Sequence, residues 1–194
     1  MSPVVELLRE LSAVLRERGV SWYLFGAQAV VLYGLPRLTA DVDVTVRIAR
    51  GEVMPLVASL REAGFALRVA DVDDFLSRTQ VLPFLHVSSG LPLDLVVAGS
   101  GLEEEFLRGA KELDLEGVRV PVIRPEDLVV AKILAGRPKD LADVRGILRV
   151  QLDAIDLARI REVLLLLEEA LDQSDLVSAF ELVSTSSAQL PSAR

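Results

Sequence analysis

The stretch FGAQAVVLYGLPRLTADVDV (residues 25–44) contains the features that decide the predicted fold. Its first residue completes the apolar run SWYLF, which favours a short buried strand that ends at Gly26, and a helical pattern follows from Ala27 to about Tyr33. After a turn rich in Gly and Pro, DVDVTVRI alternates polar with β-branched residues at a period of two. That alternation is typical of a strand with one polar face. The sequence therefore predicts a strand, a glycine, a short helix and a second strand in close succession.

Three aspartates are candidates for a shared metal site. Asp41 and Asp43 are separated by one residue, so their side chains are expected on the same face of the second strand. Asp94 lies in LPLDLVVAG, an apolar neighbouring strand in which an unpaired carboxylate would be costly. A divalent cation would offset the repulsion among three carboxylates, and oxygen ligands suit magnesium, with manganese as an alternative. In the competing interpretation, Asp41 and Asp43 are the solvent face of an edge strand and Asp94 belongs to a turn.

Gly26 favours the metal interpretation. A glycine between a strand and a helix allows the backbone to approach a phosphate closely, and the start of the helix favours anions. A phosphate cradle and a metal pair would then coincide. Two magnesium ions about 4 Å apart, which clamp the attacking and leaving oxygens, are a known solution for nucleotidyl transfer.

Composition excludes several classes of protein. The net charge of −8 is unfavourable for a general nucleic-acid binder, although residues 124–149 carry more basic than acidic side chains and could offer an anionic substrate a local surface. The absence of cysteine excludes disulfides, thiolate metal sites and cysteine nucleophiles. No apolar run of about 18 residues predicts a membrane span, and the charged first helix is unlike a secretory signal. We therefore expect a cytoplasmic protein with no membrane partner.

The remaining patterns predict an α+β fold: a small mixed sheet flanked by helices, with a helical C-terminal region. Gly19 is expected to stop the first helix, and residues 81–99 form two strands joined through a turn at 88–90. His86 in this pair is interpreted as a structural residue. From Pro125 the pattern becomes helical, which predicts a boundary between residues 1–124 and 125–194. Other expected segments are helices at 3–18, 51–64, 125–136, 139–150 and 156–171, a strand at 66–70 and a frayed tail at 184–194.

The stretch at 25–44 resembles the signature of the polymerase-β-like nucleotidyltransferase superfamily, in which an apolar residue and Gly precede Asp-x-Asp. The form with Tyr-Gly, Pro-Arg and Thr before the acids is similar to AbiEii-type toxin nucleotidyltransferases and their uncharacterised relatives. A second block, PEDLVVAKILAGRPKDLADVRGIL (residues 125–148), is similar to the downstream motif of that group. In that motif a helix Lys is followed by Arg and then by Asp-x-x-Asp. The resemblance covers residues 20–150.

The resemblance implies a catalytic core in residues 1–124 and a helical region that completes the nucleotide cleft. Asp41, Asp43 and Asp94 would be the catalytic metal ligands, and Asp94 would also activate the attacking hydroxyl. Gly26 and Ala27 would line the triphosphate. Ala27 departs from the family, which often has Ser or a second Gly there, so one phosphate contact is lost while the backbone N–H remains.

In the second block, the resemblance implies that Lys132 reaches the triphosphate as a point charge. Asp140 and Asp143 lie three residues apart on one helix face and could orient Lys132 or Arg37. Alternatively, Lys132 is an exposed lysine and the two aspartates are a solvated helix start. Arg37, together with Thr39, would brace the loop before the metal ligands.

The function implied by the resemblance is transfer of a nucleoside monophosphate from a nucleoside triphosphate to an acceptor, with release of pyrophosphate. An RNA acceptor, the 3′ end of tRNA, and a cognate antitoxin partner follow from the toxin-like form of the motif. The acidic balance opposes an RNA acceptor and keeps a small-molecule or protein acceptor as an alternative. A further alternative is a catalytically inactive binding module with the same fold, which the substitution at Ala27 favours and the retained carboxylates oppose.

Overall fold

The structure is a computed structural model that describes residues 2–35, 39, 41–99 and 101–188, with side chains as far as Thr185. The chain divides into two compact units. Residues 1–29 and 38–123 form one, here called the sheet unit, and residues 30–37 and 124–194 form the other, the helical unit. Residues 30–37 therefore belong with the C-terminal helices, although they lie near the start of the chain.

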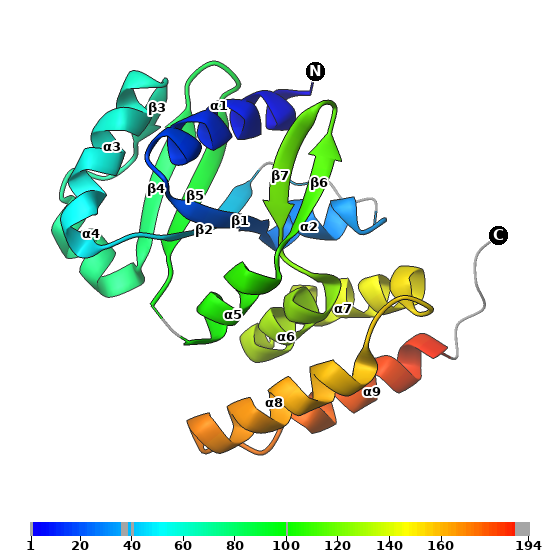
Figure 1. Ribbon diagram of the computed structural model, residues 1–194. Helices are drawn as coiled ribbons and strands as arrows, with labels where there is room; N and C mark the ends of the chain where they lie inside the picture. The colour runs from blue at the N-terminus through cyan, green and yellow to red at the C-terminus, as the bar shows by residue number, and fades with distance from the viewer. Residues whose placement is uncertain (1, 36–38, 40, 100, 189–194) are drawn as a thin grey trace. The chain divides into compact units, whose positions relative to one another are not determined.

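A mixed sheet organises the sheet unit (Figure 1). Its strand order is β3-β4-β5-β2-β1-β7-β6. β2 runs parallel to β5 and β1 runs parallel to β7, whereas the other neighbours are antiparallel. The strands are β1 (Ser21–Phe25), β2 (Val42–Arg47), β3 (Phe65–Leu67), β4 (Val81–His86), β5 (Leu91–Val97), β6 (Lys111–Leu115) and β7 (Val118–Val122). The central position of β2 excludes the edge-strand alternative for Asp41 and Asp43.

Helices pack around this sheet. Helix α1 (Pro3–Glu17) begins at a Ser2 cap, whose hydroxyl accepts the backbone N–H of Val5. It buries an apolar face that includes Leu8 and Leu11, and it contacts β1, β5 and β7. The predicted stop follows, since Gly19 has a φ of +65°. The other helices of the unit are the start of α2 (Gly26–Leu32), the 3₁₀ turn η1 (Arg50–Glu52), α3 (Val53–Glu62), α4 (Val72–Thr79) and α5 (Gly101–Gly109).

The predicted hairpin is β4–β5, and it contains the buried His86. The two imidazole nitrogens lie 2.7 Å from Ser89 Oγ and 2.9 Å from a Glu10 carboxylate oxygen. The ring packs on Phe65 with 4.8 Å between centroids. His86 is thus a hydrogen-bonded core residue, as the sequence indicated.

The helical unit contains α6 (Pro125–Ala135), α7 (Pro138–Gln151), α8 (Leu157–Leu171) and α9 (Leu176–Ala188). The segment at 30–35 packs on α7: Gln151 Nε2 donates to the Tyr33 carbonyl at 3.1 Å, and Leu35 fills the space beside Gly146. The predicted tail is wrong in part, because 184–188 continue α9. Phe180 and Val183 on that helix are buried, so packing stabilises a segment whose sequence is too polar to indicate a helix. Among the described residues, no helix is long and apolar enough to cross a membrane.

Candidate functional site

Asp43 and Asp94 lie side by side on two adjacent strands near the centre of the sheet. They are register partners on the parallel strands β2 and β5, so both side chains project from the same face. Phe25 on β1 and Pro83 on β4 extend this row on either side. The structure therefore brings together two of the three predicted carboxylates by backbone pairing alone.

Asp41 lies just before β2 and is exposed. Its carbonyl accepts hydrogen bonds from Gln28 Nε2 at 3.4 Å and from Thr39 Oγ1 at 3.5 Å. Thr39 therefore contacts the segment that leads into β2. Arg37, its predicted companion, lies outside the described residues.

The electrostatics of Asp94 link it to Asp41. Burial raises the pKa of the Asp94 carboxyl above its usual value, the positive charge of Arg68 opposes this rise, and the negative charge of Asp41 adds to it. Arg68 Nη1 lies 4.0 Å from Asp94 Oδ1. The negative charges of Asp41 and Asp94 attract cations, and Arg68 beside Asp94 neutralises part of that charge.

The Asp43 side chain leaves no room for a side chain at Gly26. Gly26 has a φ of +66°, and a Cβ atom built there would lie 2.0 Å from Asp43 Oδ2. Any side chain at this position would therefore displace the carboxylate. The group that approaches the Gly26 backbone in the structure is the Asp43 side chain. Ala27 follows in the first turn of α2.

Three carboxylates of this type suit a hard divalent cation such as Mg²⁺. Within the described residues, however, no three Asp, Glu, His or Cys side chains are gathered closely enough to form a metal-binding group. The donor chemistry fits the ion, and the register of Asp43 with Asp94 supplies two neighbouring donors.

Lys132, Asp140 and Asp143 form a buried ion cluster in the helical unit. Lys132 Nζ donates to Asp143 Oδ2 at 2.7 Å and to Asp140 Oδ1 at 3.3 Å. The Lys132 side chain is only 8% exposed. Neither alternative considered from the sequence holds here, because the lysine is not a surface residue and the two aspartates are not a solvated helix start.

A second basic residue completes this cluster. Arg137 Nε donates to Asp140 Oδ2 at 2.5 Å. Burial alone would raise the pKa of the Asp140 carboxyl, but the hydrogen bond from Arg137 and the charge of Lys132 outweigh it and hold that pKa below its usual value. Asp140 therefore remains ionised and pairs with two cations.

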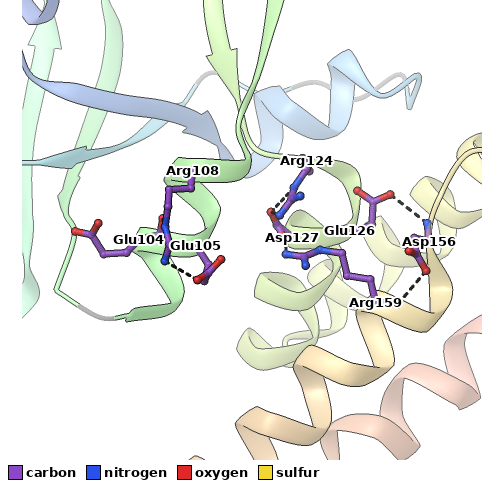
Figure 2. A network of polar contacts seen from close by, with 8 residues as sticks. All are labelled: Glu104, Glu105, Arg108, Arg124, Glu126, Asp127, Asp156 and Arg159. Carbon is purple, nitrogen blue, oxygen red and sulfur yellow. Dashed lines mark hydrogen bonds and ion pairs between the residues drawn. The ribbon is translucent and has the colours of Figure 1, made fainter.

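The helical unit contains a second network of polar contacts, which the sequence patterns do not predict (Figure 2). Asp127 is almost completely buried between Arg124 Nη2 at 2.8 Å and Arg159 Nη2 at 3.1 Å. Glu126 accepts the backbone N–H of Asp156 at 3.1 Å. These contacts join α6 to α8. The sequence signal for this network was the Glu-Asp pair directly after Pro125. Acidic residues are common at the start of a helix, so this pair does not indicate that the two side chains are buried.

Two residues near the carboxylates were also missed. Gln28 reaches the Asp41 carbonyl from α2, and Arg68 reaches Asp94 from the residue after β3. The position of Gln28, two residues after Gly26, could have drawn attention as a polar residue on a short apolar helix. Arg68 gives no local signal, because its contact depends on the pairing of β3 with β4 and of β4 with β5.

Residues 3–187 match a family described as "Nucleotidyltransferase of unknown function (DUF6036)". The chain belongs to this family. It is accordingly a nucleotidyltransferase, which confirms the activity class predicted from residues 25–44. No curated protein shows a significant sequence match to this nucleotidyltransferase.

Solved structures share its fold. An antigenic nucleotidyltransferase-like protein from Paracoccidioides brasiliensis is 20% identical over 91% of each chain, with a TM-score of 0.56. ANT(2'')-Ia in complex with adenylyl-2''-tobramycin is 18% identical over 93% of this chain and 98% of that chain, with a TM-score of 0.59. A Thermotoga maritima protein assigned as a nucleotidyltransferase is 16% identical over 75% and 92%, with a TM-score of 0.50. These likenesses confirm the polymerase-β-like fold.

Proposed function

We propose that the enzyme transfers a nucleoside monophosphate from a nucleoside triphosphate to a hydroxyl acceptor at a site built on Asp41, Asp43 and Asp94. One observation carries this proposal: Asp43 and Asp94 are register partners on adjacent parallel strands, and Asp43 lies against the backbone of Gly26. Two carboxylates side by side on adjacent strands repel each other, which is a cost to the fold, so a functional reason for them is favoured.

The cation that fits this donor set is Mg²⁺, with Mn²⁺ as an alternative. When bound, it would supply electrostatic stabilisation to the phosphoryl oxygens of the triphosphate. Asp41, Asp43 and Asp94 are the residues that would hold it. Gly26 and Ala27 would offer backbone N–H groups to the triphosphate.

The protein's own contribution to the chemistry centres on Asp94. The acceptor oxygen forms a bond to the α-phosphorus, the bond from that phosphorus to the bridging oxygen breaks, and pyrophosphate leaves. Asp94 would accept the proton of the acceptor hydroxyl, as the resemblance to the polymerase-β-like superfamily implies. Burial raises the pKa of the Asp94 carboxyl, and the charge of Arg68, 4.0 Å away, opposes this rise.

Residues of the helical unit have a supporting role in this proposal. Lys132 is the candidate for the triphosphate contact, and Asp140 and Asp143 hold its ammonium group in one place. Arg37 and Thr39 would stabilise the loop before Asp41. Asp140 and Asp143 engage two of the three N–H donors of the Lys132 ammonium group, which leaves one donor for a triphosphate oxygen.

For the acceptor we propose an RNA 3′ hydroxyl, that of tRNA, with an antitoxin as a regulatory partner. The support is the similarity of the Tyr-Gly, Pro-Arg and Thr pattern before Asp41 to the AbiEii-type enzymes. A small-molecule hydroxyl is the second candidate. ANT(2'')-Ia, whose structure contains adenylyl-2''-tobramycin, aligns over almost its whole length, and a net charge of −8 favours a cationic acceptor.

A labelling experiment separates these acceptors. Each of the four α-³²P nucleoside triphosphates is incubated with the enzyme and with total RNA, tobramycin or a protein extract, in magnesium and in EDTA. Magnesium-dependent label in small RNA supports the first candidate, and label in tobramycin supports the second. Label in neither RNA nor small molecule, with no pyrophosphate released, contradicts the proposal and favours a binding module. Asp43→Asn serves as the matched inactive control.

A further inference from the structure

A recess lined by arginine side chains lies at the end of the β1–β2 ladder opposite to Asp43. It has a volume of about 590 Å³, within the range of sites for small ligands. Its lining includes four arginines and one acid, Glu112. The arginines are Arg16, Arg47, Arg108 and Arg119. The chain as a whole has 29 acidic and 21 basic residues, so this local excess of positive charge runs against the overall balance.

The recess is separate from the carboxylate site. Ser21 and Arg47 pair at one end of the β1–β2 ladder, whereas Phe25 and Asp43 pair at the other. Ser21 lines the recess. Four residues of strand correspond to roughly 13 Å. One mononucleotide held at Asp43 would therefore not also occupy the recess.

Two of the arginines have weak partners and two have none in the described part of the chain. Arg47 pairs with Glu104 at 3.0 Å, and Arg108 pairs with Glu105 at 2.5 Å. The two side chains of each pair are substantially exposed to solvent. Exposed pairs of this kind contribute about 0–1 kcal/mol, so an incoming anion can replace them. For Arg16 and Arg119, no ion pair is formed with any described residue.

The geometry of the arginine side chains indicates which anion the recess could bind. The guanidinium group presents a planar fork of N–H donors that matches phosphate oxygens two at a time. Arg16 comes from the last turn of α1 and Arg119 from β7, so donors enter the recess from two different elements. Trp22, which is buried beside them, supplies an apolar wall. We propose that this recess binds phosphate groups, as a second site distinct from the carboxylate site.

The only tryptophan of the chain makes the proposal directly testable, because Trp22 lines the recess. The full-length protein in EDTA is titrated with pyrophosphate, ATP and a single-stranded ten-nucleotide RNA, and the Trp22 fluorescence is followed. The variant Arg16→Gln/Arg119→Gln is compared with Arg9→Gln/Arg61→Gln, which removes the same charge from exposed positions outside the recess. Asp43→Asn is the third comparison.

We expect saturable binding in the wild-type protein and an affinity about tenfold weaker in Arg16→Gln/Arg119→Gln, because two charge-assisted contacts are lost. The Arg9→Gln/Arg61→Gln and Asp43→Asn variants should bind as the wild type does. Tighter binding of ATP than of RNA assigns the site to a free nucleotide, and the reverse assigns it to a polynucleotide backbone. Circular dichroism checks folding, and Arg16→Lys/Arg119→Lys replaces the Gln variant if that does not fold, with a smaller loss expected.

The proposal is overturned if no probe changes the Trp22 fluorescence, or if the two double variants bind every probe with equal affinity. It is also overturned if Asp43→Asn rather than Arg16→Gln/Arg119→Gln alters binding, since the ligand would then occupy the carboxylate site. None of these outcomes depends on turnover, so the result stands whichever acceptor the enzyme uses.

Discussion

The Asp43 carboxylate lies against the Cα atom of Gly26, so closely that a Cβ there would be 2.0 Å from Oδ2. Two constraints therefore act on one residue. The φ of +66° favours glycine by itself, and the carboxylate excludes a side chain independently. Because Gly26 also begins α2, this contact fixes the start of the helix relative to the strand that holds Asp43.

Replacing Gly26 with alanine should damage both stability and activity. Left-handed backbone costs a non-glycine residue about 1–2 kcal/mol, and overpacking against Asp43 should add about 1–3 kcal/mol. Gly19→Ala is the matched control, because Gly19 has a φ of +65° but no atom within 4 Å of its Cβ position. Urea unfolding and pyrophosphate release measure the two effects. Equal destabilisation of the two variants, with full activity in Gly26→Ala, would show that the contact with Asp43 is unimportant.

Asp43→Asn should separate function from stability. The amide is nearly isosteric but neutral, so it weakens a cation site and should lower the rate on the order of 10²–10³-fold. The melting temperature should stay the same or rise, since a charge is removed from beside Asp94. Magnesium-dependent pyrophosphate release and a thermal melt are measured together, with the exposed Asp73→Asn as control. A marked fall in melting temperature with unchanged turnover would mean that Asp43 is a structural residue.

The central strands could be predicted because their patterns are local. Period-two alternation and β-branched residues identified β2, and the turn at 88–90 identified the β4–β5 hairpin. The pairing of Asp43 with Asp94 is not local, since it follows from the order of strands in the sheet. The β6–β7 hairpin was missed, although Glu116 and Gly117 both have positive φ and lie between two alternating runs. The sequence signal for this turn was a single Gly after Glu116, because two-residue hairpin turns prefer Asn-Gly, Asp-Gly or Gly-Gly.

The helical unit shows a different limit. The periodic apolar residues predicted α6, α7 and α8 well, but periodicity does not reveal which charged residues become buried. Lys132 and Asp127 are both buried, and each is compensated by partners on another helix or turn. Tyr33 and Leu35 pack on α7, a contact between segments far apart in the sequence. Both outcomes depend on tertiary packing, which is not encoded in the local pattern.

The burial of Lys132 changes the expected effect of removing it. From the sequence, Lys132→Ala should weaken triphosphate binding and leave the fold intact. In the structure the substitution would leave Asp140 and Asp143 buried beside each other with less compensation, which costs about 3–5 kcal/mol. Urea unfolding compares Lys132→Ala with Lys139→Ala, an exposed lysine of α7 that should be neutral. Similar stability of the two variants would return Lys132 to a purely ligand-binding role.

Asp140 predicts how the stability of the protein depends on pH. Its pKa in the folded state is held below that of the unfolded chain, which is about 3.9. The stabilisation from Asp140 is therefore fully present above the unfolded pKa and is lost as the pH falls through the folded pKa. Asp140→Asn should reduce the free energy of unfolding at pH 7 by about 1–3 kcal/mol, because hydrogen bonds from Lys132 and Arg137 to a charged acceptor are lost.

The difference in unfolding free energy between wild type and Asp140→Asn should be constant from pH 7 to about pH 5, because the carboxyl is ionised in both states throughout that range. It should then narrow as the pH falls below about 4, where the unfolded state begins to bind a proton that the folded state still excludes. Urea unfolding at steps of half a pH unit measures this curve. Asp153→Asn, an exposed aspartate of the same unit, should show no such narrowing. A difference that persisted unchanged to the acid limit would mean that the contribution of Asp140 comes from packing rather than from its charge.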